Sequence, residues 1–293
     1  MRVFVTGATG FIGSAVVQDL QGAGHTVLGL ARSDKSADAL IAAGAEVHRG
    51  ALDDLDALAA GARGCDGVIH LAFIHDFSKY AANAETDRVA AAAMAAALRG
   101  TGKPLVVTSG TAVLAPGRIG VETDAPTAQI RSASELVLAE AAHGVRVSVV
   151  RLAPSVHGAG DHAFVPALID IARRTGVSAY VGKGGNRWSA VHRLDAATLF
   201  RLALEKATPG SRFHGVAEEG IAVRTIAETI ATGLGIPLRS VTEGEEATAH
   251  FGWLAAFLAM DAPASSAMTR EVLGWAPNQP DLVTDMRLNG YFT

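Results

Sequence analysis

The sequence predicts an α/β fold in which a doubly wound parallel sheet carries a smaller C-terminal α/β lobe. Short apolar runs alternate with helical stretches over the first 150 residues, a glycine-rich turn joins the first run to the first helix, and the alternation loosens after Arg151. Strands that alternate with helices pair in parallel through right-handed crossovers, which builds a sheet covered on both faces. The 293 residues exceed the usual size of one domain, which favours two lobes.

The predicted strands are aliphatic or β-branched runs bounded by Gly, Pro or polar residues. They are Val3–Thr6, Thr26–Leu30, Ala45–Arg49, Gly67–Leu71, Pro104–Thr108 and Val145–Arg151. The predicted helices between them are rich in Ala, Leu and Glu, which are good helix formers. They are Ile12–Gln21, Lys35–Ala43, Leu55–Ala60, Tyr80–Leu98 and Ala133–Ala142.

The second half predicts fewer regular elements. We expect a strand at Arg212–Val216, a helix at Val223–Leu234 and an amphipathic stretch at Ala247–Phe257. Trp253 and Phe257 fall on one helical face, where they either line a pocket or pack in the core. We divide the chain into a first lobe, residues 1–155 together with about 188–216, and a second lobe, residues 156–187 and 217–293.

Composition excludes several classes of function. The formal charge is −4, from 25 basic and 29 acidic residues, and no basic stripe indicates nucleic acid. The single cysteine excludes an intrachain disulfide and fits a reducing compartment. The longest apolar stretch, Val89–Leu98, is about half of what a membrane-spanning helix needs. Because Met1 leads directly into the first strand, we expect no signal peptide, no membrane association and a cytoplasmic location.

The turn Thr6–Gly13 reads Thr-Gly-Ala-Thr-Gly-Phe-Ile-Gly and follows a strand and opens a helix. Its first glycine suits a tight turn, the second lets backbone approach a pyrophosphate, and the third allows close packing of helix on strand. Backbone N–H groups and the helix dipole then hold the phosphates. This context indicates a Rossmann-type dinucleotide site, with cofactor contacts expected at Gly7, Thr9, Gly10, Phe11, Ile12 and Gly13.

The end of the second strand favours NADP(H). The acidic residue that usually holds the ribose 2′-hydroxyl is missing there, and Arg32 and Ser33 stand in its place. A guanidinium and a hydroxyl suit a 2′-phosphate, because guanidinium pairs well with phosphate oxygens. Asp34 lies next to them and keeps NAD(H) open as the less favoured cofactor.

Five segments together resemble the extended short-chain dehydrogenase/reductase superfamily, also called the NAD-dependent epimerase/dehydratase family. They are Thr6–Gly13, Cys65–Ala72, Val106–Thr111, Arg151–Gly158 and Val191–Ala197, in the order the family has them. The resemblance covers residues 1 to about 235. It implies a nucleotide-binding first lobe, a substrate-binding second lobe, and further cofactor contacts at Leu52, Leu71, Ala72, Thr108, Arg131 and Pro154.

The chain departs from that family at its proton donor. Family members use a Tyr-x-x-x-Lys pair, and none of the three tyrosines here has a lysine four residues on. Aligning Glu135 with the glutamate that follows the family's lysine puts Arg131 at the lysine position and Thr127 at the tyrosine position. A threonine hydroxyl does not replace a phenol of pKa about 10 as a general acid. Arg131 keeps the charge and the donors for a ribose, but a guanidinium does not release its proton.

Histidine is the natural substitute, because its pKa lies near 6.5. His75 and His157 are the favoured candidates, since each follows a strand near the expected switch point of the sheet. His70 and His192 are weaker candidates. For each histidine, a hydrogen-bonded structural role is the alternative.

A cluster of hydroxyls ends the fifth strand, where the family keeps its catalytic Ser or Thr. Thr108, Ser109 and Thr111 form it, and Gly110 takes the family's catalytic register itself. Ser109 or Thr111 would polarise a carbonyl by donating a hydrogen bond, or would serve only in a turn.

The sequence therefore predicts an NADP(H)-dependent oxidoreductase of atypical short-chain dehydrogenase type that acts on a small carbonyl substrate. The alternatives are a non-catalytic NADP(H)-binding redox sensor and a nucleotide-sugar epimerase or dehydratase. The histidines lack metal-site spacing, so we predict no metal. The resemblance implies a monomer or a homodimer, because the family often pairs through helices equivalent to Tyr80–Leu98 and Ala133–Ala142.

Overall fold

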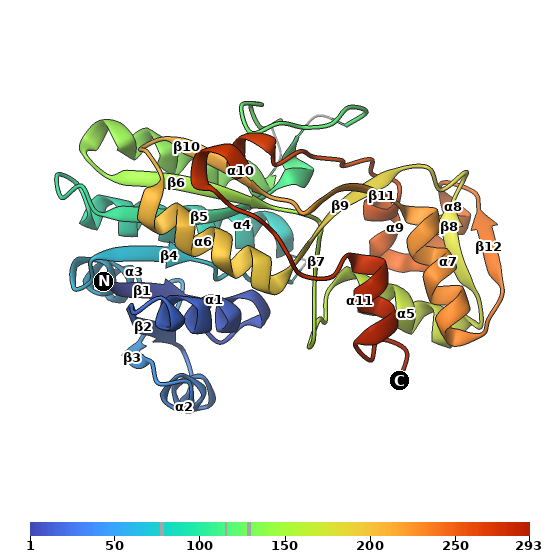
Figure 1. Cartoon of the computed structure of the whole chain (residues 1–293), viewed down its shortest axis with the longest axis horizontal. Helices are drawn as coiled ribbons and strands as arrows, with labels where there is room; N and C mark the ends of the chain where they lie inside the picture. Colours follow the sequence, from blue (N-terminus) through green and yellow to red (C-terminus); the bar gives the residue numbers. More distant parts are fainter. Residues whose placement is uncertain (77–78, 115, 128–129) are drawn as a thin grey trace.

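The computed structural model describes residues 1–76, 79–114, 116–127 and 130–293, which form two lobes side by side (Figure 1). None of the helices within these ranges is long and apolar enough to cross a membrane.

The first lobe is built on a parallel sheet that has seven strands in the described residues, in the order β10-β6-β5-β4-β1-β2-β3. The strands are β1 (Arg2–Thr6), β2 (Thr26–Ala31), β3 (Glu46–Arg49), β4 (Gly67–His70), β5 (Pro104–Gly110), β6 (Arg146–Leu152) and β10 (Ser211–Gly215). Both faces of the inner strands are covered, so these strands are continuously apolar. The order reverses between β1 and β4, which places the ends of these strands, Thr6 and His70, next to each other. The prediction of a doubly wound parallel sheet is confirmed.

Helices cover the two faces of this sheet (Figure 1). One face packs against α1 (Phe11–Gly22), α2 (Asp34–Ala42) and α6 (Arg193–Lys206). The other face packs against α3 (Leu55–Arg63), α4 (Tyr80–Ala97) and the 3₁₀ segment η3 (Ile130–His143). A short 3₁₀ turn, η2 (Thr111–Val113), follows β5. The helix expected at Ala133–Ala142 is therefore present as 3₁₀ structure.

The second lobe combines two small sheets with helices around a separate core. Its strands are β7 (Ser155–His157), β9 (Arg187–His192) and β11 (Glu218–Ala222) in one sheet, and β8 (Ser178–Val181) and β12 (Leu238–Val241) in the other. Its helical segments are α5 (Phe164–Thr175), α7 (Val223–Leu234), α8 (Glu245–Phe251), η4 (Gly252–Leu254), α9 (Ala255–Leu258) and α11 (Leu282–Leu288).

The chain crosses between the lobes more often than we predicted. Of residues 188–216, which we assigned to the first lobe, α6 and β10 pack there, whereas β9 pairs with β7 in the second lobe. A later segment, α10 (Ala267–Leu273) with Trp275, also packs on the first lobe, although we assigned residues 217–293 to the second. Trp275 is buried there and its indole donates to the carbonyl oxygen of Asp195 at 2.9 Å. Burial of this large side chain against α6 explains why the chain returns to the first lobe here. Helix α10 has only seven residues, too few for a periodic pattern that would predict this return.

Candidate functional site

The glycine loop between β1 and α1 forms a cradle that larger residues would fill. Gly7 has φ +69°, and a Cβ there would lie 2.8 Å from the backbone nitrogen of Ala72. A Cβ on Gly13 would lie only 1.9 Å from the carbonyl oxygen of Gly7. Helix α1 begins at Phe11 without a side-chain cap and without an acidic residue in its first turn. The loop therefore fits a diphosphate held by open backbone N–H groups.

The other predicted cofactor residues lie along the same edge of the sheet. Leu71 and Ala72 directly follow β4, and their N–H groups donate to the carbonyl oxygen of Thr6 at 3.2 Å and to its hydroxyl at 3.3 Å. Pro154 follows β6, and Leu52 lies after β3, partly buried against the core. Thr9 in the glycine loop is exposed, and Phe11 and Ile12 are partly buried.

At the end of β2, three neighbouring polar residues have different partners. The Ser33 hydroxyl caps α2 by accepting from the N–H of Ser36 at 3.2 Å. The Asp34 carboxylate pairs with Arg49 at 2.7 Å. Arg32 is exposed and makes no hydrogen bond or ion pair to another described residue. The guanidinium of Arg32 is therefore available to a cofactor bound here, whereas the carboxylate of Asp34 is already paired with Arg49.

Arg131 lies under the ends of β4 and β5, held by three acceptors. One nitrogen, Nη1, donates to Asp87 Oδ2 at 2.8 Å and to Ser134 Oγ at 3.0 Å. The other, Nη2, donates to the carbonyl oxygen of Thr108 at 2.9 Å. The ring of Phe73 lies against the guanidinium, 4.5 Å from its carbon. Nε–H and one Nη2–H have no partner among the described residues, so the group is still able to donate to a ligand.

Asp87 connects Arg131 to the middle of the sheet. Its other oxygen accepts from His70 Nε2 at 3.1 Å, and His70 Nδ1 lies 2.7 Å from the Thr6 hydroxyl. Burial acts to raise the pKa of Asp87, but the hydrogen bond from His70 and the charges of His70 and Arg131 outweigh it and lower the pKa below its usual range. Residues of β1, β4, α4 and η3 thus form one buried polar chain that ends at Arg131.

The predicted hydroxyls do not meet at one point. Thr108 donates to the carbonyl oxygen of His70 at 2.7 Å, which ties β5 to β4. Ser109 is buried and points to the opposite face of the strand, as the alternation along β5 requires. Thr111 is buried with its hydroxyl 3.4 Å from that of Ser189 in β9, at the contact between the lobes. Gly110 leaves the position between Ser109 and Thr111 without a side chain.

Thr127 is engaged in local structure. Its N–H and its hydroxyl both donate to the carbonyl oxygen of Val113, at 2.8 and 2.7 Å. Glu135, which set the register of this alignment, is buried in a bidentate pair with Arg151 at 2.7 and 2.8 Å. The Thr127 proton is therefore donated to backbone, in agreement with the argument that threonine is no general acid.

His75 lies near Arg131, and both side chains contact Phe73. The Phe73 and His75 rings meet edge to face at 5.1 Å. Partial withdrawal from water lowers the pKa of His75, and the positive charges of Arg131 and His162 lower it further. Phe73 also contacts Tyr80, at 6.1 Å between ring centres. Burial raises the pKa of the Tyr80 phenol, and the charge of Arg131 acts in the opposite direction. We did not single out Tyr80 from the sequence, because no basic residue follows it at the family spacing.

His157 lies in the second lobe, whereas we expected it near the switch point of the large sheet. It ends β7, a strand of the small sheet, and its side chain is only 1% exposed. Its Nδ1 lies 2.8 Å from Asp285 in α11, and its ring packs against His192. A buried imidazole paired to the C-terminal helix favours the structural role that was its alternative.

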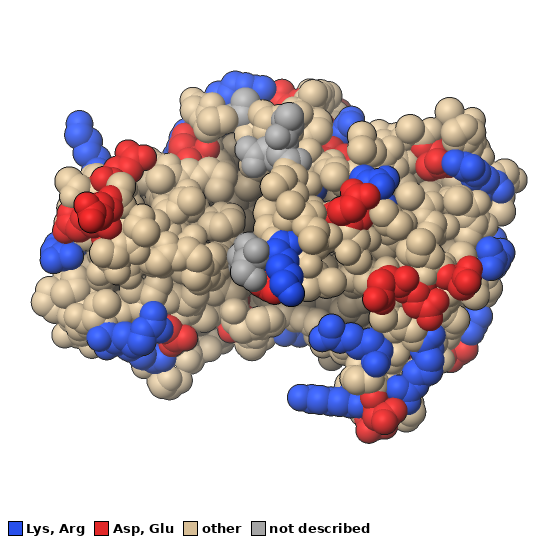
Figure 2. Space-filling view, turned by 180° about the vertical axis from the view of Figure 1, so that it is seen from behind, with Lys and Arg blue, Asp and Glu red and all other residues tan. Residues whose placement is uncertain are grey.

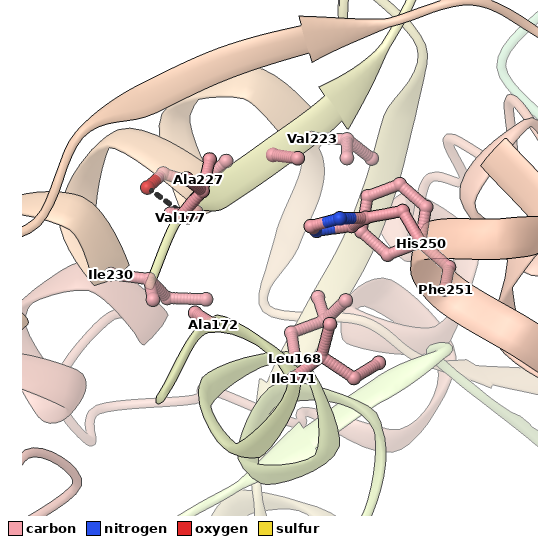
Figure 3. Close-up of a pocket in the computed structure, with 11 residues that line it drawn as sticks. Leu168, Ile171, Ala172, Val177, Val223, Ala227, Ile230, His250 and Phe251 are labelled. Atoms are coloured by element: carbon pink, nitrogen blue, oxygen red, sulfur yellow. Dashed lines mark hydrogen bonds between the residues drawn. The ribbon is translucent and has the colours of Figure 1, made fainter. Parts of the chain in front are cut away.

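Two cavities in the second lobe do not border this site. One holds about 10 Å³ between α5, β8, α7 and α8, room for about one water molecule beside His250 (Figure 3). The other, about 340 Å³, lies beside the turn at 182–186, at the end of β9 distant from α6. Over the described ranges, no three His, Cys, Asp or Glu side chains are grouped as metal ligands.

Comparisons with known proteins agree with this geometry. Residues 3–214 match the model of the NAD dependent epimerase/dehydratase family. An uncharacterized protein of Schizosaccharomyces pombe is 53% identical over all of both chains. A ketoreductase of Stigmatella aurantiaca, which acts on a farnesylated dihydroquinoline oxide, is 33% identical over 72% of this chain and 66% of that protein. The fold is similar to that of a dTDP-glucose 4,6-dehydratase of Streptomyces venezuelae solved with NAD, with a TM-score of 0.79, 19% identity, and coverage of 100% of this chain and 96% of that one.

We predict that Gly13→Ala weakens dinucleotide binding at least about tenfold, because its Cβ would collide with the Gly7 carbonyl and push α1 away from the loop. The matched control is Gly22→Ala in the same helix, where an added Cβ meets nothing within 4 Å. Titration calorimetry with NADPH and NADH measures both variants. Unchanged affinity in Gly13→Ala would contradict the assignment of this loop.

Proposed function

Because the chain belongs to the NAD-dependent epimerase/dehydratase family, we propose that it is an NADPH-dependent reductase of small carbonyl compounds. One observation carries the proposal: the glycine cradle and Arg131 lie at adjoining strand ends, and buried Asp87 fixes the guanidinium there. The ketoreductase title of the Stigmatella relative supports reduction. The absence of a Tyr-x-x-x-Lys pair argues against a sugar epimerase or dehydratase of the usual mechanism.

The choice of NADPH over NADH depends on Arg32. Its guanidinium is exposed at the end of β2, where the adenosine ribose lies in a Rossmann site. Asp34, the residue that would favour a free 2′-hydroxyl, is paired with Arg49. A 2′-phosphate is therefore attracted by one cation and faces no unpaired carboxylate next to it.

When bound, NADPH would supply a hydride for the carbonyl carbon, and the carbonyl oxygen would take up a proton, so that an alcohol forms. Arg131, whose Nε–H and one Nη2–H remain available, would hold the ribose, and its positive charge would stabilise negative charge that develops on the carbonyl oxygen. His75, close to Arg131, gives the proton to that oxygen, and its lowered pKa makes the protonated ring a stronger acid. Asp87 and His70 position Arg131 without reaching the substrate.

The function is tested by incubating the protein with NADPH and a panel of aldehydes, ketones, enones and imines. We expect oxidation of NADPH with at least one carbonyl class, at equal molar yield of alcohol. Tight NADPH binding without turnover of any compound would reject the reductase and favour a nucleotide-responsive sensor. Such a sensor would then distinguish NADPH from NADP⁺ in binding a protein partner.

Replacing Arg32 tests the cofactor preference. We expect Arg32→Ala to weaken NADPH binding by about tenfold or more, the value of one charge-assisted hydrogen bond to phosphate, and to leave NADH unchanged within about twofold. Lys183→Ala removes the same charge from the second lobe and serves as the control. Calorimetry on the wild-type protein decides the premise, because tighter binding of NADH than of NADPH would reject it.

The pH dependence of reduction tests His75. Its pKa lies below 6.5, so the protonated acid is lost as the pH rises through that value, and kcat falls with it. We expect His75→Gln to lower kcat by about a hundredfold and to remove this limb of the pH profile. His143→Gln, at an exposed histidine of η3, is the control. If His75→Gln keeps both the rate and the limb, Tyr80→Phe is the next variant to measure.

A further inference from the structure

We propose that Arg193 is a further cofactor-binding residue, which donates to the diphosphate of the dinucleotide held by the glycine loop. The proposal rests on the cofactor part of the proposed function and does not depend on the reduction of a carbonyl. Arg193 is the first residue of α6 and directly follows β9. It therefore stands where the chain returns from the second lobe to the first.

Helices α1 and α6 lie side by side and both begin at the glycine loop (Figure 1). The guanidinium carbon of Arg193 lies 5.0 Å from the ring centre of Phe11, the first residue of α1. About two turns further along, Asp19 of α1 accepts from Thr198 of α6 at 2.9 Å and from Arg201 at 2.6 Å. The two helices therefore run parallel, and the partial positive charges of their N-termini add at the loop.

Within the described residues, no carboxylate neutralises the positive charge at this point. Helix α1 has no acidic residue in its first turn. Asp195, in the first turn of α6, is buried and accepts two backbone N–H groups of the C-terminal segment, at 3.0 and 3.1 Å. Asp161 accepts from the hydroxyl of Tyr291 at 3.1 Å. Figure 2 shows that the furrow between the lobes on the back of the molecule is bordered mainly by uncharged side chains.

The guanidinium of Arg193 is held in place and keeps most of its donors. Nη1 donates to the carbonyl oxygen of Ala159 at 2.8 Å, the one acceptor that Arg193 has in the described part of the chain. The ring of His162 meets the Phe11 ring edge to face at 5.8 Å, so Phe11 is in contact with both residues. A guanidinium carries five N–H donors, and a planar group with several of them free suits phosphate oxygens.

The contact with Phe11 favours the diphosphate over other parts of the dinucleotide. The backbone N–H groups at the start of α1 would hold the diphosphate, and Phe11 is the first residue there. Because the guanidinium of Arg193 contacts the side chain of that same residue, it is within reach of an anion on those N–H groups. Arg32 lies at the end of β2, toward the adenosine ribose, and Arg131 lies under the ends of β4 and β5.

Electrostatics supplies the reason for binding. Without an anion, the guanidinium of Arg193 and the two helix N-termini repel one another, because all three are positive. A diphosphate between them replaces this repulsion by attraction and accepts the free N–H groups. The second lobe thereby contributes to cofactor binding through a single side chain.

The test measures binding of NADPH, NADH and ADP-ribose by titration calorimetry to the wild-type protein, Arg193→Met and Arg193→Lys. Methionine keeps a long side chain against Phe11 without charge or donors, whereas lysine keeps the charge. We expect Arg193→Met to weaken all three ligands by about tenfold, since each contains the diphosphate, and Arg193→Lys by less than about threefold. Raising the salt concentration should weaken binding more steeply in the wild-type protein than in Arg193→Met.

Two controls separate a phosphate contact from a general disturbance. Arg224→Met removes another guanidinium of the second lobe that lies over an aromatic ring, that of Tyr180, and should leave all three affinities unchanged within about twofold. Adenosine 2′-monophosphate lacks the diphosphate, so the wild-type protein and Arg193→Met should bind it equally within about twofold. Equal binding of this nucleotide also shows that the variant is folded.

Unchanged affinities in Arg193→Met would overturn the proposal. A loss for NADPH and NADH without a loss for ADP-ribose would also overturn it, because the arginine would then act at the nicotinamide. An equal loss for adenosine 2′-monophosphate, or no binding of any dinucleotide by the wild-type protein, would do the same. If the protein binds dinucleotides and reduces no carbonyl, only the proposed function fails, and these affinities still decide the role of Arg193.

Discussion

The ion pair between Asp87 and Arg131 is the contact on which the arrangement of the site depends. Asp87 is 2% exposed, and a carboxylate that deep in a protein is stable as an anion only with partners for its oxygens. His70 and Arg131 supply those partners from two directions, and Arg131 then reaches the carbonyl of Thr108. A lysine at the position of Arg131 would bring one compact charge, whereas the planar guanidinium bridges several acceptors at once and still has donors left. The carboxylate therefore explains why the cation here is arginine.

A second set of contacts fixes how the lobes meet at this site. Arg193 and His162 both lie on Phe11, so the segment before α5 rests on the cofactor loop. The same segment is fixed from behind, because Tyr291 donates to Asp161 and accepts from the N–H of Gly158. His157 and Asp285 complete this contact in the core. The C-terminal residues thus hold the segment before α5 in place without contacting the glycine loop. His157 has a structural role in this contact, because it pairs with Asp285.

The sequence predicted the first lobe well and the second poorly, for a physical reason. The glycine loop is local, since the spacing of Gly7, Gly10 and Gly13 alone encodes the turn and the close approach to Ala72. Strands β1, β2, β5 and β6 of the sheet are apolar runs of five to seven residues, whose pattern follows from burial on both faces. The strands of the second lobe have three to six residues and mixed polarity, too short for a periodic signal. Contacts between residues far apart in the chain, such as Arg131 with Asp87 or Trp253 with Phe164, leave no trace in spacing. The buried polar chain that ends at Arg131 was therefore found only from the fold.

Replacing the family's lysine by a fixed arginine also changes which group is able to move a proton. In the usual pair, the cation stabilises a phenolate four residues before it, so charge and acid act together. Here the cation lies near the imidazole of His75, and a positive neighbour disfavours the protonated ring, which is the acid of the proposed reaction. A lower pKa makes the protonated ring a stronger acid, which raises the rate of proton transfer. It also lowers the protonated fraction at neutral pH, which reduces the rate. In the proposed reaction, Arg131 would thereby separate two tasks that the family combines: it would hold the cofactor at every pH, while the proton would come from His75, whose protonation varies with pH.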